Sequence, residues 1–260
     1  MQDKRSFIIE GIKFESDACT GCGLCTKSCP FRLIGREADG SPFFRNDGIA
    51  CMECGHCAAV CPKGAIRVRG EKATPIDKRD ELSFIRERRS YRRYRAENVP
   101  FETIERAIDA TRYAASGKNL HSVEWTVITD GKLITGIART LLEKIRTMPE
   151  RALRYKYVAE DEDPTFWGAS ALVVAHGDPK ASILPDDSDG FIAATAFDFA
   201  AQALGLGTCW SGTAIFAPDA VKAAGRIPAD HRVYAVIMVG YPDERFVALP
   251  PRKKAKITRV

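Results

Sequence analysis

Two copies of one cysteine pattern constrain this chain more than any other feature. Residues 19–30 read C-x2-C-x2-C-x3-C-P, and residues 51–62 repeat the pattern 32 positions later. These copies hold eight of the nine cysteines, and only Cys209 lies outside them. A disulfide framework is disfavoured, because the chain has 260 residues and its N-terminus lacks the basic, apolar, small-residue order of a secretory signal. The crowding favours metal or cluster ligation.

The spacing predicts two [4Fe-4S] clusters. Three thiolates of each run can hold three corners of a cubane, while the fourth reaches the other cluster. The first cluster takes Cys19, Cys22, Cys25 and Cys61, and the second takes Cys51, Cys54, Cys57 and Cys29. Zinc is the alternative, but zinc sites usually pair two C-x2-C arms across a longer spacer. Residues 8–72 resemble the bacterial two-cluster ferredoxin family.

Four further cysteine and histidine residues receive no ligand role. His56 lies inside the second run, where each cluster already has four cysteines, so we expect it to face solvent or form a hydrogen bond. Cys209 is expected to be a small buried hydrophobe. His176 and His231 are predicted to take part in no metal site.

The chain is predicted to divide into a cluster module (residues 1–72), a linker (73–80) and a second module (81–260). Apolar runs predict strands at residues 7–14, 65–70, 124–129, 170–175 and 232–239. Helical spacing predicts helices at 81–89, 100–115, 131–147 and 191–204. The fold class is therefore α+β.

Positive charge is concentrated in two short segments. Residues 81–95 carry a net +4 and residues 243–260 a net +4, whereas residues 96–242 carry a net −5. Nucleic-acid binding is disfavoured because it needs a broad basic stripe. Two basic segments around an acidic middle can instead clamp one phosphate.

Four motifs of the second module resemble the FMN-dependent nitroreductase family: RRSYRRY, SGKNLHSVEW, GLGTCWSG and YPDERFVALPPRKK. The resemblance implies an FMN-binding α+β sandwich. Guanidinium forks and a hydroxyl suit the FMN phosphate. The predicted contacts are Arg88, Arg89, Ser90, Arg92, Ser116, Asn119, Ser211, Gly212, Arg252 and Lys253. His121 is either a proton donor or a hydrogen-bonded surface residue, and the glycine-rich turn either brings amides to the flavin or only ends a helix.

Together the modules predict an iron–sulfur flavoprotein oxidoreductase. Single electrons from a low-potential donor, such as ferredoxin or NAD(P)H, would pass through two [4Fe-4S] clusters to FMN. FMN would then reduce a nitroaromatic, quinone or enone-like acceptor by hydride transfer. An electron relay to a protein partner is the alternative. The family resemblance implies a homodimer, and the sequence predicts a cytoplasmic protein with no membrane or nucleic-acid partner.

Overall fold

The computed structural model describes residues 12–45, 49, 51, 54–76, 82–149, 163–182 and 187–260. The chain forms two compact units, one of residues 1–87 with 244–260 and one of residues 88–243. These bounds differ from the predicted second module at both of its ends. The sequence assigned residues 81–87 and 244–260 to the second module, whereas the structure groups them with the cysteine repeats. Of the strand predicted at residues 7–14, residues 7–11 lie outside the described part.

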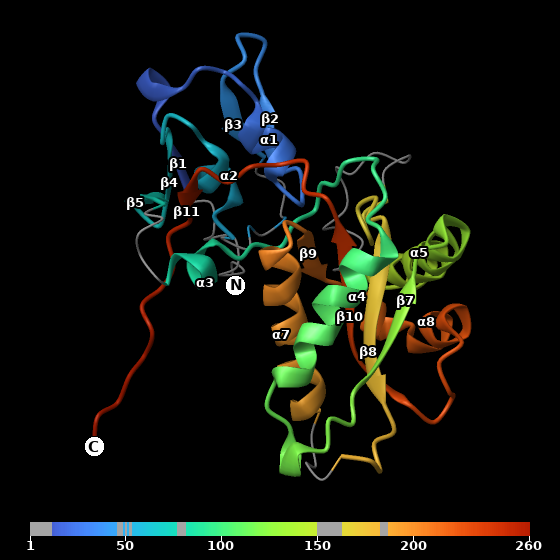
Figure 1. Ribbon diagram of the computed structural model, residues 1–260. Coiled ribbons are helices and arrows are strands. Elements are labelled where there is room, and N and C mark those ends of the chain that lie inside the picture. Colours follow the sequence, from blue (N-terminus) through green and yellow to red (C-terminus); the bar gives the residue numbers. More distant parts are fainter. Residues whose placement is uncertain are drawn as a thin grey trace, which may run out of the picture. The chain divides into compact units, whose positions relative to one another are not determined.

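The first unit is built from short elements around the cysteine repeats (Figure 1). An antiparallel sheet has the order β1 (Ile12–Phe14), β4 (Ile66–Val68), β5 (Glu71–Lys72), and β2 (Ile34–Arg36) pairs with β3 (Pro42–Phe44). A 3-10 turn (Ser16–Ala18) and the helices α1 (Leu24–Ser28), α2 (His56–Val60) and α3 (Ser83–Glu87) complete it. β6 (Thr74–Pro75) pairs with β11 (Ala248–Leu249) from the C-terminal segment. Ile34, Ala58, Ile66 and Val68 form the centre of a small core.

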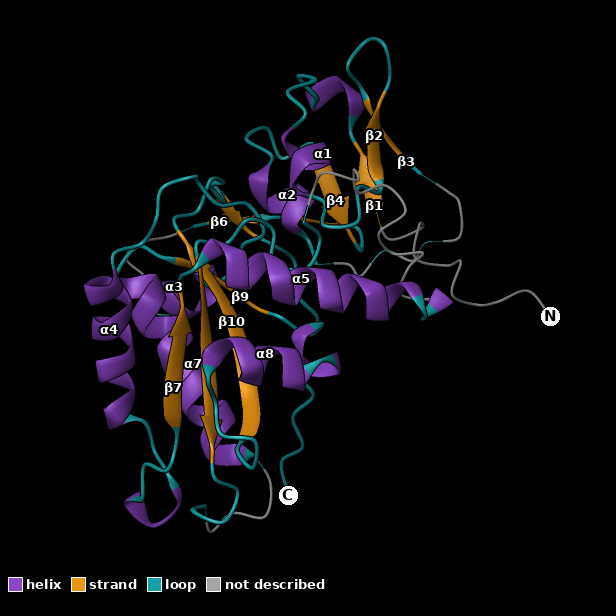
Figure 2. Cartoon of the chain, turned by 90° about the vertical axis from the view of Figure 1, so that its right-hand side faces the viewer, coloured by secondary structure: helices purple, strands orange, loops and turns teal. Residues whose placement is uncertain are grey.

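The second unit is a four-stranded antiparallel sheet between two pairs of helices (Figures 1 and 2). The strand order is β7 (Glu124–Ile128), β8 (Ala171–Gly177), β10 (Arg232–Gly240), β9 (Gly207–Trp210). The helices α4 (Phe101–Ala110) and α7 (Ser188–Ala203) cover one face, and α5 (Gly131–Arg146) and α8 (Pro218–Gly225) cover the other. Short 3-10 turns lie at Thr111–Tyr113, Gly117–Asn119 and Ala214–Phe216.

The alternating direction of side chains along the central strands explains why helices pack on both faces of the sheet. Successive side chains of a strand point to opposite faces. Val173 and Ile237 pack with Phe197 of α7, whereas Val174 and Met238 pack with Leu141 of α5. Every residue of β8 is buried, because helices cover both of its faces. The expected α+β sandwich is confirmed. Within the described ranges, no helix combines the length and apolarity needed to cross a membrane.

Candidate functional site

The structure gathers the cysteines into the two predicted groups of four. Cys19, Cys22, Cys25 and Cys61 line one cavity. In the second group, Cys57 lies in the electrostatic field of Cys54, Cys29 and Cys51. Each group thus takes three cysteines from one repeat and the fourth from the other.

Local geometry makes the two repeats nearly identical. Gly23 before α1 has φ 72° and ψ 6°, and Gly55 before α2 has φ 73° and ψ 8°. Glycine adopts this left-handed conformation without steric cost, so the loop of three cysteines can turn directly into the helix that presents the fourth. Beyond the helices, Leu33 N–H donates to Cys29 Sγ and Ala65 N–H donates to Cys61 Sγ, both at 3.3 Å. The fourth sulfur of each repeat is therefore oriented in the same way.

Burial makes these thiols costly to ionise in the absence of positive charge. It raises the pKa of Cys25 and of Cys29, and it raises the pKa of Cys57 well above the usual value, with neighbouring cysteines adding to the effect. A thiolate in such a place needs cationic iron, which deprotonates coordinating thiols. The four thiols and the N–H donor aimed at one sulfur fit an iron–sulfur cluster in each group.

The C-terminal segment packs against the second cysteine loop. Arg252 Nη1 donates to the Cys54 carbonyl at 2.8 Å, and Val247 N–H donates to the Ala59 carbonyl at 2.9 Å. Phe246 contacts the His56 ring edge-on at 4.9 Å. His56 is only 4% exposed because the apolar C-terminal segment covers it. Of the two roles expected for His56, facing solvent is therefore wrong.

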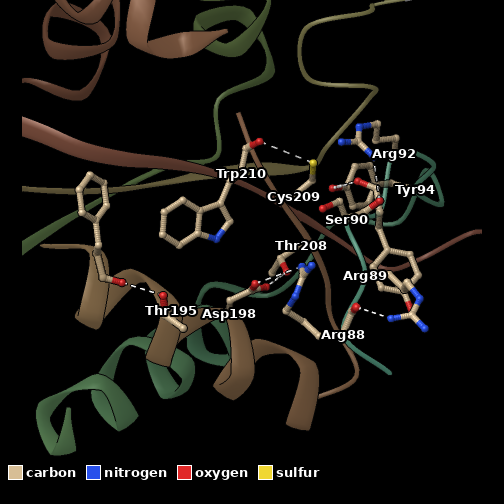
Figure 3. Close-up of polar contacts among 12 residues, drawn as sticks. Arg88, Arg89, Ser90, Arg92, Tyr94, Thr195, Asp198, Thr208, Cys209 and Trp210 are labelled. Atoms are coloured by element: carbon tan, nitrogen blue, oxygen red, sulfur yellow. Dashed lines mark hydrogen bonds and ion pairs between the residues drawn. The ribbon is translucent and has the colours of Figure 1, made fainter. Parts of the chain in front are cut away.

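In the second unit, the arginine-rich segment lies beside strand β9. Ser90 forms a parallel bridge with Thr208, and Tyr91 N–H donates to the Thr208 carbonyl at 2.9 Å. Arg92 Nη1 donates to the Ser90 carbonyl at 3.2 Å, and Arg89 is 4% exposed. Arg88, Arg89, Ser90 and Arg92 thus come together on one edge of the sheet (Figure 3). Cys209 of β9 is 1% exposed, which confirms its predicted role as a buried hydrophobe.

Asp198 is a member of this site that the sequence analysis missed. It lies on α7, where it accepts a hydrogen bond from Thr208 Oγ1 and forms an ion pair with Arg88 Nη1 at 3.4 Å (Figure 3). Burial raises the pKa of Asp198, and the Thr208 and Arg88 contacts act in the opposite direction. The available sequence signal was a single carboxylate within the apolar run FIAATAFDFAAQA.

Ser116, Asn119 and His121 form a second group of predicted residues. His121 N–H donates to Ser116 Oγ at 3.0 Å, and the His121 ring nitrogen Nε2 lies 2.9 Å from Asn119 Oδ1. Asp189, buried at the start of α7, accepts from Gly117 N–H at 2.9 Å. His121 is exposed and hydrogen-bonded, and its backbone φ of 48° is left-handed, as are those of Lys118 and Asn119. Such strain often marks a binding loop.

Within one chain, the two groups lie on opposite edges of the sheet. The loop with Ser116 and Asn119 leads into β7, whereas Ser90 lies beside β9, the strand at the opposite edge of the sheet. Ser211 and Gly212 follow β9 directly and belong with the Ser90 group. Ser211 is buried, and its N–H donates to the Val236 carbonyl at 2.8 Å. Arg252 and Lys253 are exposed residues of the other unit.

Two family models match different parts of the chain. Residues 85–241 match the Nitroreductase family and residues 18–66 match the 4Fe-4S dicluster domain. The chain belongs to the nitroreductase family. These matches confirm the expected pairing of a two-cluster ferredoxin-type module with a nitroreductase-family oxidoreductase module.

Individual relatives support the same assignment. A protein of Methanothermobacter thermautotrophicus with the name "Putative NADH dehydrogenase/NAD(P)H nitroreductase" is 30% identical over 174 residues, which cover 65% of this chain and 81% of the relative. The FMN-bound nitroreductase of Desulfitobacterium hafniense DCB-2 has a TM-score of 0.58 at 22% identity, covering 69% of this chain and 97% of that one. An FMN-bound nitroreductase of Bacteroides fragilis NCTC 9343 has a TM-score of 0.57 at 23% identity, covering 70% and 98%. These structural likenesses establish the fold of the second unit.

Proposed function

We propose that this chain is an iron–sulfur flavoprotein oxidoreductase that carries single electrons from a low-potential donor to an organic acceptor. One observation supports it most: a single chain holds two groups of four cysteines and a nitroreductase-family unit with a basic, hydroxyl-bearing segment. When bound, [4Fe-4S] clusters exchange single electrons and FMN exchanges one or two, so the pair can couple one-electron donors to two-electron acceptors.

The residues of the second unit have separate roles in this proposal. Arg88 and Arg89 offer guanidinium groups and Ser90 a hydroxyl to the FMN phosphate. Arg92, half-buried beside Ser90, places a positive charge near the flavin, which favours negative charge on the reduced ring. Gly212, exposed after β9, offers a backbone approach to the ring. The cysteine groups would hold the clusters, with Cys61 and Cys29 exchanged between the repeats.

The separation of the two predicted contact groups supports a homodimer. Ser116 and Asn119 precede the edge strand β7, whereas Ser90 lies beside β9 at the opposite edge of the sheet. In a two-fold dimer, the loop of one copy can complete the site formed by Arg88 and Ser90 of the other.

The donor is reduced ferredoxin or NAD(P)H in this proposal. The archaeal relative with NAD(P)H nitroreductase in its name supports a nicotinamide donor, and the two cysteine groups support a one-electron donor. Nitroaromatic, quinone and enone-like compounds are the proposed acceptors, because these accept two electrons together with protons.

An anaerobic experiment tests the proposal. Purified protein is expected to hold FMN and about eight iron atoms per chain. Rapid mixing with reduced ferredoxin should bleach the cluster absorbance first and the flavin absorbance afterwards, and an added quinone should restore both. Protein that retains no flavin and gains none from added FMN would contradict the proposal. A flavin that is reduced but turns over only with a protein acceptor would favour the relay.

Matched variants test whether FMN and the iron–sulfur clusters bind at separate sites. Arg88→Gln is expected to weaken FMN binding and to leave the iron content unchanged. Arg93→Gln serves as its control, because Arg93 belongs to the same segment but pairs with the exposed Asp243 at 2.8 Å. The double variant Cys22→Ala/Cys54→Ala should lose iron and keep FMN. Loss of both cofactors in either experiment would contradict separate sites.

A further inference from the structure

Three side chains of types that can bind metals meet at one end of the central sheet, and none of them has a role in the proposal above. The Nδ1 atoms of His176 and His231 lie 3.0 Å apart, and Glu124 Oε1 lies 3.9 Å from His231 Nε2. One ligand atom from each of the three residues lies within 4.8 Å of the other two. No part of the proposed electron transfer uses them.

The backbone holds these residues together by strand register. Glu124 of β7 is directly opposite His176 of β8, so their side chains share a face of the sheet. His176 is also opposite Val233 of β10, two residues after His231. Three adjacent strands or strand ends therefore each supply one potential ligand, which limits how far they can separate.

A neighbouring threonine orients the buried histidine. His176 is 3% exposed, and its Nε2 lies 3.0 Å from Thr126 Oγ1. When Nε2 donates its proton to this hydroxyl, Nδ1 presents a lone pair toward His231. Metal-binding histidines commonly have such a partner on the second ring nitrogen, which fixes the tautomer and the ring orientation.

The separation of the two nitrogens suits a shared cation. Two imidazole nitrogens bound to one tetrahedral Zn²⁺ at 2.0–2.1 Å lie about 3.3 Å apart. The observed 3.0 Å therefore needs little adjustment. Without a cation, one of the two Nδ1 atoms must carry a proton, because facing lone pairs repel. A divalent ion can replace that proton.

We propose that Glu124, His176 and His231 form a binding site for a divalent first-row transition-metal ion such as Zn²⁺. Two imidazoles and one carboxylate form a donor set that suits these ions. The Glu124 side chain is 59% exposed, so it can swing toward the ion while solvent water occupies a remaining position. The ion would connect β7, β8 and the start of β10.

Zinc uptake by the full-length protein with its clusters assembled tests the proposal. Anaerobic equilibrium dialysis against Zn²⁺, with metal analysis, should find one more zinc per chain in the wild type than in His231→Gln. Glu124→Gln should weaken this zinc binding by roughly tenfold or more, since even outer-sphere partners of ligands contribute that much. His121→Gln is the control, because it removes an exposed imidazole elsewhere in the same unit.

A second readout protects the test against misfolding and against zinc bound at cysteines. Zinc should raise the unfolding temperature of the second unit in the wild type and in His121→Gln, and should raise it less in Glu124→Gln. Iron content must be the same in all proteins. Equal zinc uptake by the wild type and His231→Gln, or an equal thermal shift in Glu124→Gln, would overturn the proposal and leave the histidine pair as a hydrogen bond only.

Discussion

Replacing Asp198 by Asn is expected to separate cofactor binding from stability. The Asp198 side chain is 6% exposed and pairs with Arg88, whose side chain is 32% exposed. Asn has the same shape and can still accept from Thr208, but it loses the charge that orients Arg88. A hydrogen bond to a charged group contributes about 1.5–3 kcal/mol, which corresponds to roughly a 10- to 150-fold change in affinity. Because a bound phosphate can itself attract Arg88, we expect the lower end, roughly a tenfold rise in the Kd for FMN.

The stability of this variant should depend on pH in a defined direction. Burial raises the pKa of Asp198, so the native state takes up a proton here more readily than the unfolded chain. The contribution of this carboxyl to stability is therefore complete below its unfolded pKa and is lost as pH rises through its native pKa. Asn does not titrate. Relative to the wild type, Asp198→Asn should gain stability as the pH rises above about 4, the pKa of an unfolded Asp.

Two measurements check this reasoning. Fluorescence titration of the flavin-free protein gives the Kd for FMN, and urea unfolding at several pH values gives the free energy of unfolding. Asp243→Asn is the control, because it breaks the exposed pair with Arg93 and should change neither quantity. Tighter FMN binding by Asp198→Asn would refute the reasoning, because Asp198 would then compete with the phosphate for Arg88.

Two further substitutions test the packing of a cysteine loop in the first unit and of helix α5 in the second. Gly55→Ala should accelerate iron loss to a chelator more than Gly64→Ala. Both glycines have positive φ, but a Cβ on Gly55 would lie 2.6 Å from Pro250 Cβ. A Cβ on Gly64 would meet nothing within 4 Å. Equal rates would show that the C-terminal segment does not constrain the loop. Leu141→Ala, at a fully buried position of α5, should cost about 2–5 kcal/mol in urea unfolding. Leu133→Ala on the same helix, where Leu133 is 42% exposed, should cost clearly less, and similar losses would contradict the packing of α5.

The cysteine groups and the central sheet could be predicted because their signals are local. Two-residue spacers confine three cysteines to one loop, and the exchange of Cys29 and Cys61 follows from the repeat itself. The buried strands β8 and β10 are continuous apolar runs, and the structure places them within two residues of the predicted ends. The predicted helix at 131–147 likewise corresponds to α5.

Features that depend on long-range pairing could not be predicted. The pairing of β11 with β6 involves only two residues of each strand, and they are more than 170 positions apart. Such a short pair has no periodic pattern of its own. His176 and His231 looked isolated in the sequence, and only the register of β7, β8 and β10 brings them to Glu124. Their proximity cannot be predicted from the sequence unless the strand register is known.

The C-terminal cations present a choice that one experiment can decide. The sequence suggests that Arg252 and Lys253 close on the FMN phosphate, whereas in the structure Arg252 donates to the Cys54 carbonyl at 2.8 Å. If this contact is its role, Arg252→Gln removes a hydrogen bond that stabilises the cysteine loop by about 1.5 kcal/mol. Iron should then leave the second cysteine group roughly tenfold faster, while the Kd for FMN stays unchanged.

Lys253→Gln removes the same charge one position along and keeps that hydrogen bond, so its iron release should match the wild type. A weaker FMN affinity in Arg252→Gln, with normal iron release, would contradict the cluster role and support the phosphate clamp. The two outcomes differ because a carbonyl bond stabilises the fold of one loop, whereas a phosphate contact acts only when the ligand is present. Iron release measured without FMN is therefore the decisive comparison.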